Sequence, residues 1–317
     1  MSVNRQHAFS TKVHGSRTSP YLQEALVLLG IEHVYGDVPG LVNRLLGIKV
    51  AVSQVYRSTL SAAEVLDVNA VNTPSPTLQK QLNDPSQTVY GMVDGSMLLY
   101  DDGWQENKLG RVFCQSEVKP MCQDRNMLSS SEYVAYRGHY SGFAEKFEQL
   151  LPPESAVQKV LISDGATWIG DWLGRSYPDA VQILDFYHVA EKLGEAAKQA
   201  KASEKWLKKQ KYMLKSGGFN QVRSAIKRLS WDAGQKEKLL AYMDNNRYRM
   251  AYDQYLAKGW MIGSGPIESA HRTVLQKRMK LSGQRWGEEG GDKMANLRVA
   301  VMSGKSHLIT NIFRQAA

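Results

Sequence analysis

Cysteine is almost absent from this sequence, with only Cys114 and Cys122 among 317 residues. Two cysteines exclude the disulfide framework of a small secreted domain, and their spacing excludes a Cys-x-x-Cys zinc site. No uninterrupted apolar run reaches the roughly 18 residues of a transmembrane helix. The polar first residues lack the apolar segment of a secretory signal. We therefore expect a protein of the reducing cytoplasm.

The overall composition is that of an ordinary globular protein, but the charged residues are unevenly distributed along the sequence. The formal net charge is +9. Residues 86–190 carry 14 Asp and Glu against 8 Lys and Arg, whereas residues 191–258 carry 16 Lys and Arg against 7 Asp and Glu. An acidic segment followed by a basic one indicates a polyanion held near a site rich in carboxylates. A solvated, Lys-rich helical surface explains the same charges.

Helical patterns dominate the first 67 residues. Apolar residues recur at helical spacing from Ser19 to Gly30, and Ser53 is placed to cap a later helix from Gln54 to about Leu66. A helix, a short turn that contains glycine and a second, capped helix follow one another here, which is the order of a helix-turn-helix. The residues that would then face a DNA groove are Gln54, Tyr56, Arg57 and Thr59. The alternative is a small helical bundle without a DNA role.

The hydrophobic period changes after residue 87. Apolar strand patterns alternate with helical ones, which predicts a mixed sheet with helices on both faces and therefore an α/β fold. The strands are expected at 88–94 with an extension to 100, 110–114, 133–137, 157–164 and 180–185, and the helices at 143–150 and 168–177. From His188 to about Lys258 the pattern is almost entirely helical.

Three acidic residues occupy positions typical of catalytic carboxylates. Asp94 lies in or at the end of the first expected strand, Asp164 ends the fourth, and Glu268 follows a Gly-Ser-Gly-Pro loop in the first turn of a helix. Ligands gather at strand ends of α/β sheets, and the glycine after each aspartate would let a substrate backbone approach. Carboxylate oxygens suit Mg²⁺ or Mn²⁺, and two such ions about 4 Å apart can activate water and stabilise the leaving oxygen of a phosphodiester. Each acid alone also has a structural interpretation, as a turn residue or at a helix N-terminus.

Together, four stretches resemble bacterial insertion-sequence transposases of the DDE class, most closely the Kra-type group, to which the Lre-type group is related. The stretches are Tyr90–Ser96 (YGMVDGS), Leu161–Trp168 (LISDGATW), Asp185–His188 (DFYH) and Gly263–Ser269 (GSGPIES). The tail RMKLSGQRW, followed by NLR, resembles the same group. The likeness runs from about Ser19 to the C-terminus, and the order and spacing of its motifs make it specific.

This resemblance implies an RNase H-like catalytic core with the triad Asp94, Asp164 and Glu268 holding two Mg²⁺ or Mn²⁺ ions. It implies that the Lys-rich helices are an insertion into that core. Asp185 and His188 would then form an accessory element, in which His188 positions a phosphate or the scissile strand. The alternative for this pair is a helix start, with Asp185 as the cap and His188 in the first turn.

Basic residues near these motifs are candidates for DNA contact. They are Arg57, Lys205, Lys208, Lys209, Lys215, Arg272, Lys277, Arg278, Lys280 and Arg285. An ion pair with Glu268, four residues earlier on the same helix, is the alternative for Arg272. Trp260 and Trp286 would stack on unpaired bases or, alternatively, lie in the core.

We therefore expect a transposase that cleaves double-stranded DNA at the element ends and transfers the 3′-OH to target DNA. It would act as a homodimer or larger assembly. We expect it in the bacterial cytoplasm near the nucleoid and not at a membrane. The expected parts are an N-terminal helical DNA-end-binding domain at 1–67, a linker at 68–86, the first part of the core at 87–190, the Lys-rich insertion at 191–258, and C-terminal core helices carrying Glu268 at 259–317. Two alternatives remain open: a nuclease of the same fold that cuts without joining, and a non-catalytic DNA-binding descendant.

Overall fold

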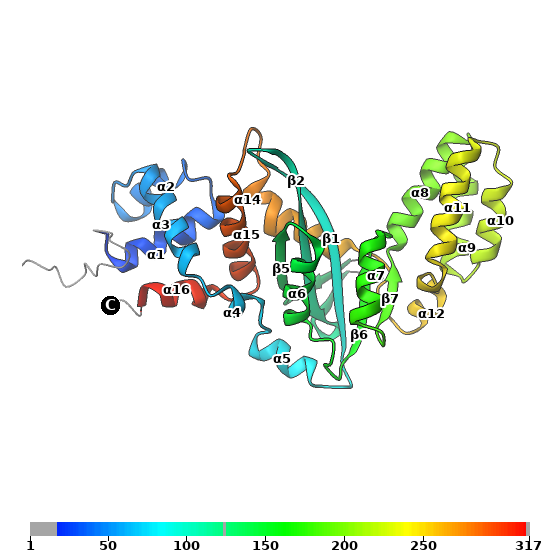
Figure 1. Ribbon diagram of the computed structural model, residues 1–317, viewed down its shortest axis with the longest axis horizontal. Helices are drawn as coiled ribbons and strands as arrows, with labels where there is room; N and C mark the ends of the chain where they lie inside the picture. Colours follow the sequence, from blue (N-terminus) through cyan, green and yellow to red (C-terminus); the bar gives the residue numbers. More distant parts are fainter. Residues whose placement is uncertain (1–17, 123–124, 315–317) are drawn as a thin grey trace, which may run out of the picture.

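A mixed five-stranded sheet forms the centre of the computed structural model, which describes residues 18–122 and 125–314 (Figure 1). The strand order is β5-β2-β1-β6-β7. β1 is antiparallel to β2, and β2 to β5, whereas β1, β6 and β7 are parallel. The strands are β1 (Thr88–Tyr100), β2 (Gly103–Cys114), β5 (Glu132–Arg137), β6 (Gln158–Ser163) and β7 (Val181–Leu184). The predicted α/β class with a mixed sheet is confirmed.

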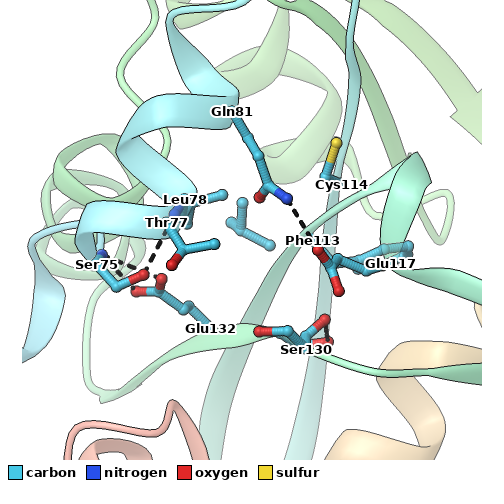
Figure 2. A pocket seen from close by; sticks show the side chains of 11 residues that line it. Ser75, Thr77, Leu78, Gln81, Phe113, Cys114, Glu117, Ser130 and Glu132 are labelled. Carbon is cyan, nitrogen blue, oxygen red and sulfur yellow. Dashed lines mark hydrogen bonds between the residues drawn. The ribbon is translucent and has the colours of Figure 1, made fainter.

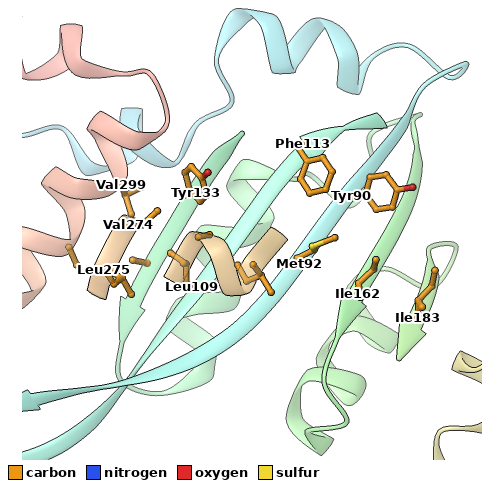
Figure 3. Packing of buried hydrophobic residues seen from close by; sticks show 14 of the residues in the cluster. Tyr90, Met92, Leu109, Phe113, Tyr133, Ile162, Ile183, Val274, Leu275 and Val299 are labelled. Carbon is orange, nitrogen blue, oxygen red and sulfur yellow. The ribbon is translucent and has the colours of Figure 1, made fainter. Parts of the chain in front are cut away.

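Successive side chains along a strand point to opposite faces of the sheet, so the strands contribute to two apolar clusters, one on each face. On one face Met92 and Ile162 belong to a large cluster that also contains Val274 and Leu275 of the C-terminal helices (Figure 3). On the other face, the cluster is completed by α6 (Tyr140–Leu150) and α7 (Thr167–Ser176). Helices therefore cover both faces, and the face with the C-terminal helices also carries the candidate site.

The N-terminal helices lie at one end of the elongated molecule, against helices from the opposite end of the chain (Figure 1). The helices are α1 (Pro20–Glu32), α2 (Val38–Leu46), α3 (Val52–Val65), α15 (Glu288–Met302) and α16 (Ser306–Arg314). Val27, Ile31 and Ala62 belong to the same apolar cluster as the sheet. The N-terminal helices therefore share their core with the rest of the protein, which the expected division at residue 67 did not foresee.

The segment 68–86, expected to be a linker with one short helix at about 77–82, packs against the body of the protein. It contains α4 (Val68–Asn72) and α5 (Pro76–Leu82), and it buries Val71, Leu78 and Leu82 against the body of the protein. The caps Asp67 and Ser75 each accept a backbone N–H at the helix start. A composition rich in Pro, Ser and Asn therefore marks two short capped helices here, because these residues favour caps as strongly as turns.

The Lys-rich segment is helical throughout and lies at the other end of the molecule (Figure 1). Its helices are α8 (Phe186–Gln199), α9 (Glu204–Lys215), α10 (Phe219–Lys227), α11 (Ala233–Asn245) and α12 (Tyr252–Ala257). Buried Tyr252 donates its hydroxyl to the Leu184 carbonyl at the end of β7, 2.9 Å away. The helical segment is thus fixed to the edge of the sheet where the parallel strands end.

Several boundaries differ from the sequence predictions. α3 begins at Val52 after Ala51, without the expected Ser53 side-chain cap, and α1 continues two residues past Gly30. The predicted helix after Pro266 is three successive turns: α13 (Gly265–Ala270), a π-helical turn at His271–Gln276, and α14 (Lys277–Met279). The hairpin of β3 (Val118–Cys122) and β4 (Arg125–Leu128) was not predicted. Within the described residues, no helix is both long and apolar enough to cross a membrane.

Candidate active site

The strand register brings Asp94 and Asp164 to the same edge and face of the sheet. Val93 of β1 pairs with Ser163 of β6 in the parallel ladder, and each aspartate is the next residue along its strand. Both aspartates share the alternation of Met92 and Ile162, which point into the cluster beneath the C-terminal helices (Figure 3). The two aspartates therefore come from adjacent parallel strands.

Glu268 reaches this face from the first turn of α13. A proline at the helix start favours the turn that presents it, because proline has no N–H to lose there. The Ser264 hydroxyl lies 3.1 Å from Glu268 Oε1 and 2.6 Å from Asp185 Oδ2. Glu268 raises the pKa of Asp94, so the two carboxylates are electrostatically coupled. Three acids from distant parts of the chain therefore meet on one face of the sheet.

The loop before α13 is held by groups that the sequence analysis did not select. Arg111 of β2 donates to the Pro266 carbonyl, 2.6 Å away, while its guanidinium lies between the rings of Phe113 and Tyr133. The Met261 N–H donates to the Tyr90 hydroxyl at 3.2 Å. These contacts fix the start of α13, and thus Glu268, against the sheet.

Asp185 follows the helix-start interpretation, whereas His188 lies near Asp94. Asp185 is only 4 % exposed, caps α8 by accepting from the Tyr187 N–H at 2.9 Å, and also accepts from Ser264. Asp185 is therefore the helix cap, and it ties α8 to the Glu268 loop. His188 lies close enough to Asp94 to oppose the rise in the pKa of that carboxyl. The histidine thus lies near Asp94.

Burial is the largest cause that raises the pKa of Asp94 from 3.8 to about 6, and the negative charges of Asp164 and Glu268 add to it. A hydrogen bond from the Gly95 N–H to Asp94 Oδ1, at 2.8 Å, acts in the opposite direction. Within residues 18–122 and 125–314, no lysine or arginine forms an ion pair with any of the three acids. Among the described residues, positive groups act on the acids at longer range: Arg249 interacts electrostatically with Asp164, and His188 with Asp94.

A divalent cation fits the chemistry of these donors. Three carboxylates supply hard oxygen ligands, and a cation would relieve the repulsion that raises the pKa of Asp94. As the described side chains stand, no three His, Cys, Asp or Glu residues are gathered tightly enough to hold a metal ion. Asp94, Asp164 and Glu268 are therefore candidate ligands arranged around an open site rather than a closed coordination sphere.

The glycines beside the aspartates have a structural purpose. A Cβ on Gly165 would lie 2.2 Å from the ring of Tyr242 in α11, and a Cβ on Gly95 would lie 2.3 Å from a carboxylate oxygen of Glu106. The sequence analysis attributes these glycines to the approach of a substrate backbone. The structure shows instead that they admit neighbouring side chains of the protein.

Two buried polar residues beside the acids were also missed. His271 is 3 % exposed, and its Nε2 lies 3.5 Å from Asp94 Oδ2. Burial lowers the pKa of His271 to about 4, so its ring is neutral near pH 7. Arg249 is 1 % exposed and donates from Nη2 to the Ser163 hydroxyl, 2.6 Å away, directly before Asp164. The sequence signal for His271 was its position three residues after Glu268, whereas Arg249 lies in an Arg-Tyr-Arg run that resembles a solvated surface.

Nine of the ten candidate DNA-contacting residues are at least partly accessible to solvent. They are Arg57, Lys205, Lys208, Lys209, Lys215, Arg272, Lys277, Lys280 and Arg285. The Lys215 ammonium lies 4.6 Å from the ring centroid of Phe186, the first residue of α8, so the Lys-rich surface reaches the neighbourhood of His188. Arg272 forms no ion pair with Glu268 among the described residues.

Two of the sequence predictions for DNA contact are wrong, and a third residue, Trp286, follows the core alternative that the sequence analysis left open. Arg278 is 1 % exposed and donates from Nε to the Gly30 carbonyl at 3.0 Å. Thr59 is fully buried and donates its hydroxyl to the Val55 carbonyl. Trp286 is buried and donates from its indole to the Met279 carbonyl at 3.0 Å, as its core interpretation requires. Each side chain is occupied inside the protein and is not available to DNA.

A small pocket elsewhere does not compete with this site. It lies between α5 and β2 and has a volume of about 10 Å³, enough for at most one water (Figure 2). Its Glu132 accepts the Ser75 N–H and pairs with Lys305 at 2.6 Å. Because this carboxylate is neutralised within the protein, we interpret the pocket as structural.

No protein-family model matches this chain, and no curated protein matches it. The argument for function therefore depends on the motifs and on the geometry described above.

Proposed function

We propose that this protein is a DDE-type DNA transposase with an RNase H-like core. The observation that carries the proposal is the convergence of Asp94, Asp164 and Glu268 on one face of the sheet, where burial, together with the negative charges of Asp164 and Glu268, raises the pKa of Asp94 to about 6. The antiparallel strands β5-β2-β1, followed by two parallel strands joined through helices, support the fold assigned to the core. The motif order and spacing support the same assignment.

In this proposal, Asp94, Asp164 and Glu268 hold one or two Mg²⁺ ions. Bound Mg²⁺ supplies the polarisation of water and of the phosphate oxygens. Cleavage forms a bond from the water oxygen to phosphorus and breaks the bond to the 3′ oxygen, which leaves a 3′-OH and a 5′-phosphate. The 3′-OH then attacks a target phosphodiester and displaces the target 3′ oxygen, without a covalent enzyme intermediate. In this proposal His188, whose charge acts on Asp94, positions a phosphate.

DNA binding follows from the basic helices at one end of the molecule. α9 presents Lys205, Lys209 and Lys215, and Lys215 lies beside the first residue of α8. At the other end, α2 and α3 expose Arg57 on the second helix of a possible helix-turn-helix. We propose that α3 reads the element end and that the Lys-rich helices bind the backbone near the cleavage site. A dimer or larger assembly follows from the need to join two ends.

The test compares isosteric variants of the three acids with a matched control. Asp94→Asn, Asp164→Asn and Glu268→Gln each keep the shape and remove one charge. Strand cleavage in Mg²⁺ should be nearly abolished, while duplex binding persists or tightens because repulsion of phosphate is reduced. Glu289→Gln is the control, because Glu289 is exposed on α15 and pairs with Lys293. Cleavage by all three variants at a rate near that of the unchanged protein would contradict the proposal.

A second experiment separates transposition from simple cleavage. Labelled DNA that already ends in the 3′-OH of an element is mixed with supercoiled target plasmid and Mg²⁺. A transposase joins the labelled end to the plasmid, whereas a nuclease of the same fold only nicks it. Binding without either product would favour the non-catalytic descendant.

A further inference from the structure

His271 is a buried histidine that the fold leaves without a hydrogen-bond partner. It begins the π-helical turn at His271–Gln276, three residues after Glu268. Neither ring nitrogen makes a hydrogen bond within the part of the chain that the structure describes. Buried polar groups are rarely left unpaired, and π-helical turns occur mostly at functional sites. Both observations point to a function for this ring beyond packing.

The neighbour of the ring is Asp94. Nε2 lies 3.5 Å from Asp94 Oδ2, slightly beyond the length of a good N–H···O hydrogen bond. The other oxygen, Oδ1, already accepts from the Gly95 N–H at 2.8 Å. A donor on each oxygen fixes the plane of a carboxylate and leaves a lone pair on each oxygen available to a ligand. Hydrogen bonds at catalytic groups are often long before substrate and ions are in place, and then shorten.

We infer that His271 is a positioning residue for Asp94, in which the neutral imidazole donates from Nε2 to Asp94 Oδ2 and fixes the carboxylate that binds the divalent ion. This inference rests on the proposed function, because it assigns Asp94 as a ligand. His271 does not itself contact DNA or the ion. The residues with charge near the ring are Asp94 and Lys280. Groups that orient a metal ligand in this way typically change metal affinity 10- to 100-fold when they are removed.

Two amide variants distinguish this function from packing. The amide nitrogen of His271→Gln reaches about as far as Nε2, whereas that of His271→Asn reaches only about as far as Nδ1. Both are polar and smaller than or similar to histidine, so a packing defect should affect both. The full-length proteins are titrated with Mn²⁺, and free Mn²⁺ is measured by electron paramagnetic resonance. Thermal unfolding in EDTA is measured in parallel.

We expect Mn²⁺ to bind His271→Gln within about threefold of the unchanged protein, and to bind His271→Asn about 10- to 100-fold more weakly. Cleavage by His271→Asn should recover as Mg²⁺ is raised, whereas unfolding temperatures of the two variants in EDTA should be similar. Equal Mn²⁺ affinity for both variants and the unchanged protein would overturn the inference. A loss of affinity that follows the loss of thermal stability in both variants would also overturn it, because that result indicates packing alone.

Asp94→Asn separates the failure of this inference from the failure of the proposed function. If the unchanged protein binds Mn²⁺ and Asp94→Asn abolishes binding, the carboxylate site stands, and the His271 variants decide the inference alone. If the unchanged protein binds no Mn²⁺ and cleaves no DNA, both the site and the function of His271 are overturned.

Discussion

At the scale of single residues, Asp94 shows how a buried carboxyl group beside like charges reduces stability. Its carboxyl is half-buried beside two like charges, which raises its pKa from 3.8 to about 6. The folded protein therefore binds this proton more tightly than the unfolded chain does. Stability is highest below the unfolded pKa and falls as the pH rises from about 4 to about 6, after which this contribution stays constant.

Asp94→Asn should consequently stabilise the protein at neutral pH. The shift corresponds to at most about 3 kcal/mol, and solvent screening of a partly exposed group reduces the expected gain to about 1–2 kcal/mol. We expect this gain in the free energy of unfolding at pH 8 in EDTA, shrinking toward zero near pH 4. Denaturant unfolding at the two pH values measures it. Asp171→Asn, at an exposed position of α7, is the control and should show no such difference. A gain that does not depend on pH would contradict this account.

At the scale of elements, the helical segment contacts the catalytic strands through a close fit at Gly165. The ring of Tyr242 in α11 occupies the place of a Gly165 side chain, and Arg249 donates to Ser163 one residue before Asp164. The segment therefore helps to position the end of β6. The helical segment thus supports the candidate site and also offers a candidate DNA surface.

Gly165→Ala should destabilise the protein by about 1–3 kcal/mol, because the new methyl group overlaps a packed ring. Tyr242→Ala should remove that overlap, so the double variant should lose less stability than the two single losses added together. A double-mutant cycle of unfolding free energies gives the interaction energy directly. Additive losses of unfolding free energy would show that positions 165 and 242 do not interact.

The exposed lysines of α9 give a second prediction at the scale of elements. Replacing Lys205, Lys209 and Lys215 by Gln should weaken binding to any duplex sequence and reduce the salt dependence by about one unit of slope for each phosphate that is no longer neutralised. Filter binding across a range of KCl concentrations measures the slope. Replacement of Lys80 and Lys119, exposed lysines outside this segment, is the control. An unchanged slope in the triple variant would show that α9 is only a solvated surface.

At the scale of the whole molecule, the two ends of the chain form one body. Arg278 donates to Gly30 and lies 4.6 Å from the ring centroid of Tyr35, while Arg298 pairs with Glu32 at 2.5 Å. The C-terminal helices thus link the N-terminal helices to the sheet that carries the acids. The helix α3, proposed to read DNA, and the three acids are therefore connected through a packed interior.

Arg278 and Arg285 should behave oppositely although both lie in the same motif. Arg278→Ala should cost about 3 kcal/mol of stability or more, because it removes a buried, hydrogen-bonded and stacked side chain. Arg285→Ala should leave stability within about 0.5 kcal/mol and weaken DNA binding. Unfolding curves and duplex binding, measured on both variants, test the pair. Equal stability of the two variants would contradict the placement of Arg278.

The sequence alone determined the α/β class, the helical Lys-rich segment, and the position of Asp94 and Asp164 in or at the end of two different strands. These follow from local periodicity, since a strand of alternating apolar residues also fixes which side chains share a face. The sequence did not determine that Arg278 and Thr59 are buried, that Asp185 is a cap, or that His271 lies beside Asp94. Burial of a polar side chain depends on which distant segment covers it, and only the tertiary structure decides that.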